Sequence, residues 1–253
     1  MRASDAFGIV LCLLIQTDSS RKCSMCGRYN FKADLNELIS HFSDLQGREI
    51  VSGPRFNVAP TQSAPVLVMK EHRPRIEMLR WGLIPFWAKD ESMAARMINA
   101  RAETVVEKPA FRSAFKKQRC LVIAHGFYEW TATLGGKQPW HIGRSDGGLT
   151  PFAGLWETWK RPQMEQELHS FTIITTTPNE VAGKIHDRMP VILPEERWDA
   201  WLAPETSVED LQTMLVPCDS SRMKAYRVSP KMNNARYEAS DCVEPLPDEL
   251  KGL

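Results

Sequence analysis

The sequence predicts a single α+β domain built on a strongly curved, barrel-like mixed β-sheet with helices at its periphery. Short β-rich runs outnumber the helical stretches along the chain. The helices are interspersed without the regular strand–helix–strand alternation of a parallel sheet. The 253 residues are 43% hydrophobic and their 17 prolines are scattered, so the chain can build one sizeable core and shows no linker.

Five stretches are predicted to form the peripheral helices. Residues 33–42 carry apolar residues at helical spacing behind a capping pair, Asp34 and Glu37. Residues 207–215 begin at Ser207, a typical helix N-cap residue. The other helical stretches are residues 108–119, 179–186 and 195–202.

The strands are recognised by short runs of β-branched and aromatic residues between turn signals. Residues 64–70 and 75–81 are separated by a short polar turn, which predicts a β-hairpin. The further predicted strands are residues 120–124, 138–144, 151–157, 170–177 and 223–229.

Residues 1–24 are expected to be a leader outside the domain, which would run from residue 25 to residue 253. Residues 6–15 are an apolar run about half as long as the ~20 residues that a membrane-spanning helix needs. The run has a weak basic region before it and a poor cleavage site after it, which argues against a signal peptide. Three explanations remain, in order of preference: translation that starts at Met25, a removable propeptide, and a change that abolishes the chemistry described below.

Charge and cysteine content narrow the function classes. The net charge is +1, and basic and acidic residues balance once residues 1–24 are set aside, so a nucleic-acid partner would need a local patch such as residues 112–119. Cys23 and Cys26 form a C-x-x-C pair, but no second pair completes a zinc site and no strand–helix context supports a redox motif. We therefore expect no metal, no cofactor and a reducing, cytoplasmic location.

Five segments combine glycine, proline, tryptophan and ionisable residues more densely than a core requires. Cys26 is either a buried apolar thiol or a nucleophile. Glu129 lies between two aromatic residues and points either to water or inward, where it would be a useful proton donor. His186 is either a surface histidine or a site residue. The segments are residues 25–30, 80–88, 98–104, 125–130 and 184–193.

Two further pairs in these segments also have structural and functional interpretations. Asn99 and Arg101 share a face of an extended segment, where the amide would orient a carbonyl or hydroxyl group and the guanidinium would hold a phosphate. The alternative is a structural turn. Trp81 and Trp87 are either core residues or stacking surfaces for nucleic-acid bases.

Taken together, the segments resemble the SRAP family, the SOS response-associated peptidase proteins, which are also called abasic-site processing proteins. The resemblance runs from Met25 to Pro245 and keeps the family's motif order. His125 stands where family members often carry an acidic residue, and residues 1–24 are the large departure. The motifs are MCGRY (25–29), NVAPTQ (57–62), WGLIPFWA (81–88), NARAET (99–104), GFYEW (126–130) and IHDRMPVIL (185–193).

The resemblance implies an SRAP-like fold and a covalent link between Cys26 and an abasic site in single-stranded DNA. The open-chain sugar of an abasic site carries an aldehyde, which condenses with an α-amine to an imine. A thiol in 1,2 relation to that amine then closes a thiazolidine ring, and only an N-terminal cysteine offers both groups. Its α-amine, with an ordinary pKa of about 7.7–8.0, is partly neutral at pH 7. Met-Cys at a start codon supplies this group once the methionine is removed.

The resemblance also implies roles for other residues. Glu129 would shuttle protons during sugar opening and imine formation, and His186 would assist imine formation and ring closure and bind the sugar or its 3′ phosphate. Asn99 would position the N-terminus and the sugar, completing a catalytic set with Cys26. The expected DNA contacts, phosphate-binding arginines and a wedge against neighbouring bases among them, are Arg28, Asn57, Pro60, Trp81, Gly82 and Arg101.

The expected partner is therefore single-stranded DNA with abasic sites, bound by a monomer with no membrane association that becomes nucleoid-associated on DNA. Weak lyase activity and self-processing would accompany the crosslink. One alternative is a thiol autopeptidase that uses Cys26 and His186 and tolerates an extended N-terminus. Another is a non-enzymatic single-strand binder, which would not need Glu129 and His186 to converge.

Overall fold

The computed structural model describes residues 27–160 and 166–247. Five strands close into a barrel in the order β10–β4–β3–β6–β9–β10, with β4 and β10 parallel and the other neighbours antiparallel. This ring confirms the predicted barrel-like mixed sheet. Its strands are β3 (Ser63–Lys70), β4 (Arg73–Trp81), β6 (Arg119–Val122), β9 (Phe152–Lys160) and β10 (Glu167–Thr176).

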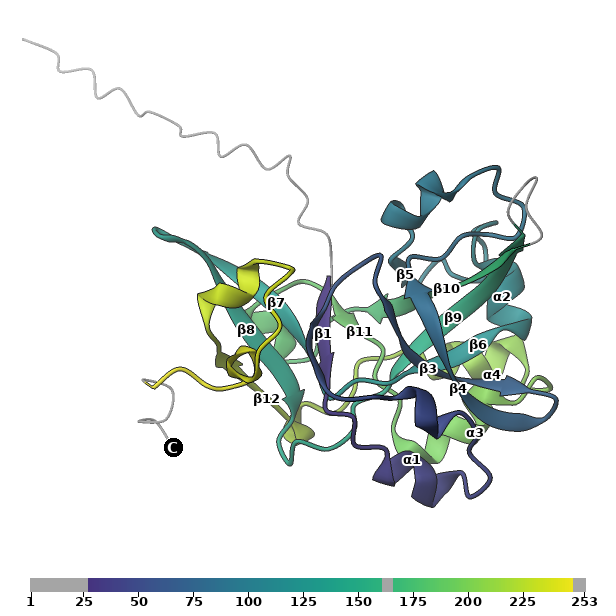
Figure 1. Cartoon of the computed structure of the whole chain (residues 1–253), viewed down its shortest axis with the longest axis horizontal. Coiled ribbons are helices and arrows are strands. Elements are labelled where there is room, and N and C mark those ends of the chain that lie inside the picture. Colours follow the sequence, from purple (N-terminus) through teal and green to yellow (C-terminus); the bar gives the residue numbers. More distant parts are fainter. Residues whose placement is uncertain (1–26, 161–165, 248–253) are drawn as a thin grey trace, which may run out of the picture.

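A second, antiparallel sheet lies beside the barrel, with the strand order β12–β8–β7–β1–β2. In Figure 1 the long β7–β8 pair lies on one side of the molecule, the barrel strands lie on the other, and β1 runs between them. The strands of the second sheet are β1 (Arg28–Phe31), β2 (Arg55–Val58), β7 (Gly126–Thr133), β8 (Gly136–Arg144) and β12 (Met223–Arg227). Two short strands, β5 (Asn99–Arg101) and β11 (Met189–Pro190), pair with β10.

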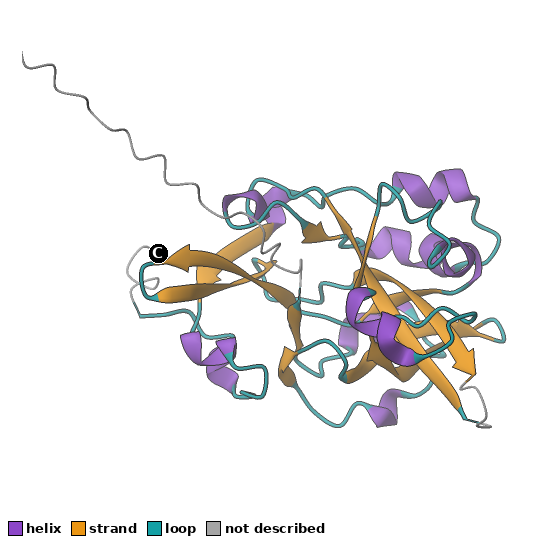
Figure 2. Ribbon diagram, turned by 90° about the horizontal axis from the view of Figure 1, so that it is seen from above, coloured by secondary structure: helices purple, strands orange, loops and turns teal. Residues whose placement is uncertain are grey.

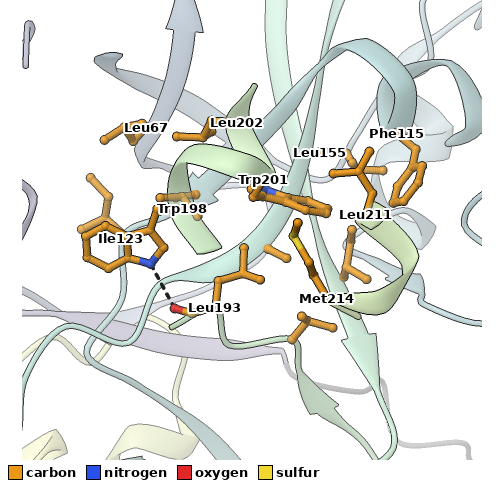
Figure 3. Packing of buried hydrophobic residues seen from close by; sticks show 14 of the residues in the cluster. Leu67, Phe115, Ile123, Leu155, Leu193, Trp198, Trp201, Leu202, Leu211 and Met214 are labelled. Carbon is orange, nitrogen blue, oxygen red and sulfur yellow. Dashed lines mark hydrogen bonds between the residues drawn. The ribbon is translucent and has the colours of Figure 1, made fainter. Parts of the chain in front are cut away.

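The two sheets share a core, which makes them one domain. Alternate residues of β3 face opposite sides: Val66 and Val68 pack with residues of both sheets, whereas Leu67 packs under the helices. Figure 3 shows this second region, where Trp198 and Trp201 cover the barrel and the indole of Trp198 donates to the carbonyl of Leu193.

The helices are short and peripheral (Figure 2). The hydrogen bond from the Asp210 amide to Ser207 Oγ confirms the predicted start of the last α-helix. Of the predicted capping pair, Asp34 accepts the amide N–H of Asn36 at 3.0 Å, whereas the prediction for Glu37 is wrong, because Glu37 binds Arg144 and the amide of Leu149 instead. The α-helices are α1 (Asn36–His41), α2 (Arg112–Lys117), α3 (Trp198–Leu202) and α4 (Val208–Thr213).

Single 3-10 turns connect many of these elements. The helix expected at residues 179–186 is reduced to one such turn, Ala182–Lys184. The other 3-10 segments are Arg48–Ile50, Glu91–Arg96, Glu195–Arg197, Ser220–Arg222, Pro230–Asn233 and Ser240–Cys242. The predicted hairpin is present, and its turn residues Glu71 and His72 both have positive φ (50° and 62°), as the twist of a tight hairpin favours.

Candidate active site

Glu129 is held in the interior by strand β7. Side chains alternate along a strand, so Glu129 shares a face with Phe127, which packs in the core between the sheets. Tyr128 points the other way, toward Val228 and Met232. The side chain of Glu129 is only 1% exposed, which places a carboxyl group in an apolar, water-poor setting. Of the two orientations considered for Glu129 in the GFYEW motif, the structure therefore has the inward one.

His186 meets this carboxyl group from a different part of the chain. Its Nε2 atom lies 4.0 Å from Glu129 Oε2, close enough for charge attraction but longer than a hydrogen bond. On the other side of the ring, the backbone N–H of Arg188 donates to Nδ1 at 3.1 Å. Nδ1 accepts this hydrogen bond only when it carries no proton, and the proton of a neutral ring is then on Nε2, facing Glu129.

The start of β1 runs next to Glu129. Arg28 pairs with Tyr128 and Tyr29 pairs with Phe127 in an antiparallel register. Continuing that register by one residue sets Gly27 opposite Glu129. Cys26, the predicted nucleophile, lies outside the described residues, as does the whole leader.

The NARAET and IHDRMP segments converge on one end of β10. Within β5, Arg101 pairs with Thr175, and Pro190 of β11 pairs with the same residue. Asn99 is half-buried and Arg101 is exposed. The guanidinium of Arg188 fastens the two segments together: its nitrogens lie 2.5 and 2.9 Å from the two carboxylate oxygens of Glu103. The extended strand predicted for Asn99 and Arg101 is thus present beside the segment of His186.

Trp81 and Gly82, expected to contact DNA bases, have structural roles here. Trp81 is completely buried, donates from Nε1 to the carbonyl of Ile98 at 2.9 Å and stacks on Phe171. Its ring is therefore inaccessible to a base in this conformation. Gly82 has φ +120°, and a Cβ atom there would lie 2.7 Å from the Ala94 carbonyl oxygen, so only glycine fits.

The exposed aromatic residues of the WGLIPFWA segment are instead Phe86 (58% exposed) and Trp87 (47%). Sequence reasoning named Trp87 as a possible stacking surface and did not single out Phe86. In the same motif Leu83 and Ile84 are buried, as is Trp81. No periodicity in the motif distinguishes these buried side chains from the two exposed aromatic rings.

Arg28 and Asn57 are joined to each other and to the C-terminal segment. Arg28 Nη1 donates to Asn57 Oδ1 and to the carbonyl of Met232, both at 2.9 Å. The Asn57 amide donates to three carbonyl groups, those of Met232, Asn234 and Tyr237. Glu238 accepts the backbone N–H groups of Phe56 and Asn57. We call this cluster the C-terminal clasp. Pro60, also expected to contact DNA, follows Asn57 by three residues and is half-exposed.

Two buried histidines support the strand that carries Glu129. The His141 ring donates from Nε2 to Asn30 Oδ1 at 2.9 Å, and burial lowers its pKa to about 3. A Cβ atom on Gly126 would collide with that ring, which explains the glycine of the GFYEW motif. His125 accepts the Lys32 amide N–H at Nδ1, and burial lowers its pKa to about 4. Both rings are therefore neutral at pH 7.

Within residues 27–160 and 166–247, no three His, Cys, Asp or Glu side chains gather as a metal site would require. The same ranges contain no helix that is both long and apolar enough to cross a membrane.

Comparison with known proteins identifies the family. Residues 25–235 match the family model described as SOS response associated peptidase (SRAP), and the chain belongs to this family. The Bacillus subtilis abasic site processing protein YoqW is 42% identical over 223 residues, which cover 87% of this chain and 99% of YoqW. The chicken abasic site processing protein HMCES is 30% identical over 78% of this chain and 69% of its own length.

Solved structures confirm the fold. A crystal structure of a Bacteroides thetaiotaomicron protein superposes with a TM-score of 0.76 at 27% identity, covering 87% of this chain and all of the other. A phage-related protein from Bordetella bronchiseptica gives a TM-score of 0.63 at 28% identity, covering 80% of this chain and 94% of the other.

Proposed function

We propose that this protein processes abasic sites in single-stranded DNA by linking them covalently to Cys26. The observation that carries the proposal is the Glu129–His186 pair, buried beside the start of the strand that Cys26 precedes. Relatives named abasic site processing proteins match 87% of the chain at 42% identity, which supports the same substrate.

The chemistry assigns a task to each group. The α-amine of Cys26 adds to the sugar aldehyde and water leaves as the imine forms. The thiol sulfur then adds to the imine carbon while its proton moves to the nitrogen, which closes the thiazolidine. Glu129 is the group that exchanges protons with the sugar oxygen and the amine, and its burial keeps bulk water from competing. The Nε2–H of His186 donates to the sugar or to its 3′ phosphate.

The proposal requires that Cys26 be the first residue of the active protein. Residues 1–24 are then either untranslated or removed, the domain is encoded from residue 25, and Met25 is cleaved off to expose Cys26. The protein acts in the cytoplasm on DNA as a monomer and needs no cofactor for this reaction. Without the thiol, the imine would undergo β-elimination and nick the strand, which is the lyase activity that we expect as a side reaction.

The decisive experiment compares chains that differ at the N-terminus. A chain that begins Met25-Cys26 should form a heat-stable adduct with single-stranded DNA containing an abasic site, resolved on a denaturing gel. The full chain, with its N-terminus verified by mass spectrometry, should form none until it is trimmed. Cys26→Ala should replace the adduct by weak strand nicking. Cys218→Ala is the matched thiol control, because Cys218 is half-buried and burial raises the pKa of its thiol to about 11.

An untrimmed full chain that crosslinks as fast as the short one would overturn the aminothiol mechanism. Self-cleavage before residue 26 that needs His186, without adduct formation, would identify the protein as a thiol autopeptidase instead. Salt-dependent DNA binding with neither reaction would identify a non-enzymatic single-strand binder.

A further inference from the structure

Arg188 is the best-anchored residue of the segment that carries His186. Its side chain is largely buried, and its guanidinium meets both oxygens of Glu103 while Nη2 also donates to the Thr175 carbonyl at 2.6 Å. Such two-point pairs fix direction as well as distance, because the planar fork matches the carboxylate. Glu103 therefore holds the backbone of residue 188 at a defined place beside β10.

That backbone is what touches His186. The Arg188 N–H donates to Nδ1 at 3.1 Å, and this donor is satisfied only when Nδ1 carries no proton. The neutral ring is then the Nε2–H form, whose proton faces Glu129 Oε2 at 4.0 Å.

A second neighbour favours the opposite arrangement. Asp187 Oδ1 also lies 3.1 Å from His186 Nδ1, and a carboxylate there accepts only from a protonated Nδ1. The Asp187 side chain is 89% exposed, so water screens it. The two contacts cannot both be hydrogen bonds to one neutral ring, and which one prevails depends on where the Arg188 backbone is held.

We infer that Glu103, acting through Arg188, is a positioning residue that selects the Nε2–H form of His186 and aims it at Glu129. This assigns a task to the acidic residue of the NARAET segment, and it builds on the function proposed above. The hydrogen bonds from Arg188 lower the pKa of Glu103, so the pair is ionised at neutral pH.

The test measures the histidine directly and separately from DNA chemistry. Long-range ¹H–¹⁵N correlation spectra of the ¹⁵N-labelled full chain at pH 7.5 report which ring nitrogen of His186 carries the proton. We expect the Nε2–H form in the unmodified chain. In Glu103→Gln and Arg188→Lys, the Nδ1–H form should gain population. Asp187→Asn should leave the Nε2–H form in place, and Glu107→Gln, at an exposed position four residues after Glu103, should change nothing.

Adduct formation is then followed with the same substitutions in the crosslinking-competent chain. Glu103→Gln and Arg188→Lys should each slow the reaction about 10-fold, the lower end of the scale known for outer-shell partners of metal-binding histidines. The double variant should be no slower than either single one, since both break one pair. Urea unfolding of each variant checks that the measured protein is folded.

An unchanged His186 spectrum in both Glu103→Gln and Arg188→Lys would overturn the inference, whatever happens to the rate. If either variant does not fold, the milder Glu103→Asp carries the same test, because it shortens the same pair by one methylene. If the chain that begins Met25-Cys26 and carries no substitution forms no adduct at all, the proposed function fails, while the tautomer measurement still decides the role of Glu103.

Discussion

Arg119 in the barrel and Glu129 in the second sheet are both charged residues in apolar strands, and both are almost fully buried, at 4% and 1% exposure. The guanidinium of Arg119 is surrounded by carbonyl groups at 2.6–2.8 Å: those of Phe115 and Lys116 at the end of α2, and those of Trp201 and Ala203 at the end of α3. Glu129 faces His186 Nε2 at 4.0 Å.

The difference shows how burial alone fails to identify a catalytic group. Arg119 donates hydrogen bonds to carbonyl groups that two helix ends leave unpaired, so its charge has a structural role. Glu129 Oε2 and His186 Nε2 lie 4.0 Å apart on segments from different parts of the chain, a separation that one substrate atom or water can bridge during proton transfer. Loss of the Arg119 charge should therefore lower stability, and loss of the Glu129 carboxyl group should lower the rate of adduct formation.

The largest effect is expected for Arg119→Met. Removing the guanidinium leaves buried carbonyl groups unpaired, and we expect a loss of about 3–5 kcal/mol in the free energy of unfolding, measured with urea. The folded fraction should still form adducts at the normal rate. Arg112→Met, on the exposed face of the neighbouring helix, should change stability by less than about 0.5 kcal/mol. A loss below about 1 kcal/mol for Arg119→Met would break the comparison.

Glu129→Gln should show the opposite pattern. The amide keeps the shape of the side chain and cannot exchange protons, so adduct formation should slow by about 10²-fold or more, equivalent to roughly 2.7 kcal/mol in the barrier. Single-turnover kinetics on denaturing gels measure the rate. Glu157→Gln is the matched control, since Glu157 in β9 is also a buried carboxyl whose pKa is raised by burial. Equal slowing by both substitutions would argue for a general structural effect.

Asn57→Ala tests whether the sheet position or the hydrogen bonding of a polar residue decides its role. Asn57 lies in the same sheet as Glu129, but its amide is fully hydrogen-bonded in the C-terminal clasp. Losing its bonds to three carbonyl groups should lower the free energy of unfolding by about 2 kcal/mol. Asn36→Ala, at the exposed first position of α1, should stay within about 0.5 kcal/mol. If Asn57→Ala instead weakens single-stranded DNA binding at unchanged stability, the original expectation of a DNA contact is right.

The sequence predicted the barrel well because its signal is local. Alternating β-rich runs gave the hairpin of β3 and β4, and Ser207 marked the start of α4. Contacts between elements far apart in the sequence were not predicted. Glu37, expected to cap a helix, instead binds Arg144, which is 107 residues away. No local pattern encodes such a competition.

The sequence identified the segments that form the candidate site, but not the side-chain contacts that join them. The motif residues Glu129 and His186 do meet, and β5 does lie beside the segment of His186. The orientation of each ring, however, follows from packing, which buries Trp81 and exposes Phe86 within one short motif. The roles of Glu103 and Arg188 emerge only when two distant segments are brought to one end of β10.

His141 is a third buried titratable group, and its effect, about as large as that of Asn57→Ala, is expected only on acidification. Its Nε2–H is satisfied by Asn30, while Nδ1 is buried and has no hydrogen-bond partner among residues 27–160 and 166–247, so a second proton would be unpaired there. Burial lowers the pKa to about 3 in the folded protein, against about 6.5 when unfolded. Between these values the unfolded chain binds the extra proton, so stability falls as the pH drops below 6.5. From pH 7 to pH 5 we expect a loss of about 2 kcal/mol from this residue, measured by urea unfolding.

The matched variant is His141→Gln, which cannot titrate. It should be less stable than the unmodified chain at pH 7, yet its stability should fall less steeply toward pH 5. The slope that remains comes in part from His125, whose pKa is lowered to about 4 by the same cause and acts with the same sign. Adduct formation by the folded fraction should not depend on His141, because its ring points to Asn30 and Tyr226 rather than to His186. Parallel pH–stability curves for the two proteins would show that His141 is not the buried group whose protonation unfolds the sheet.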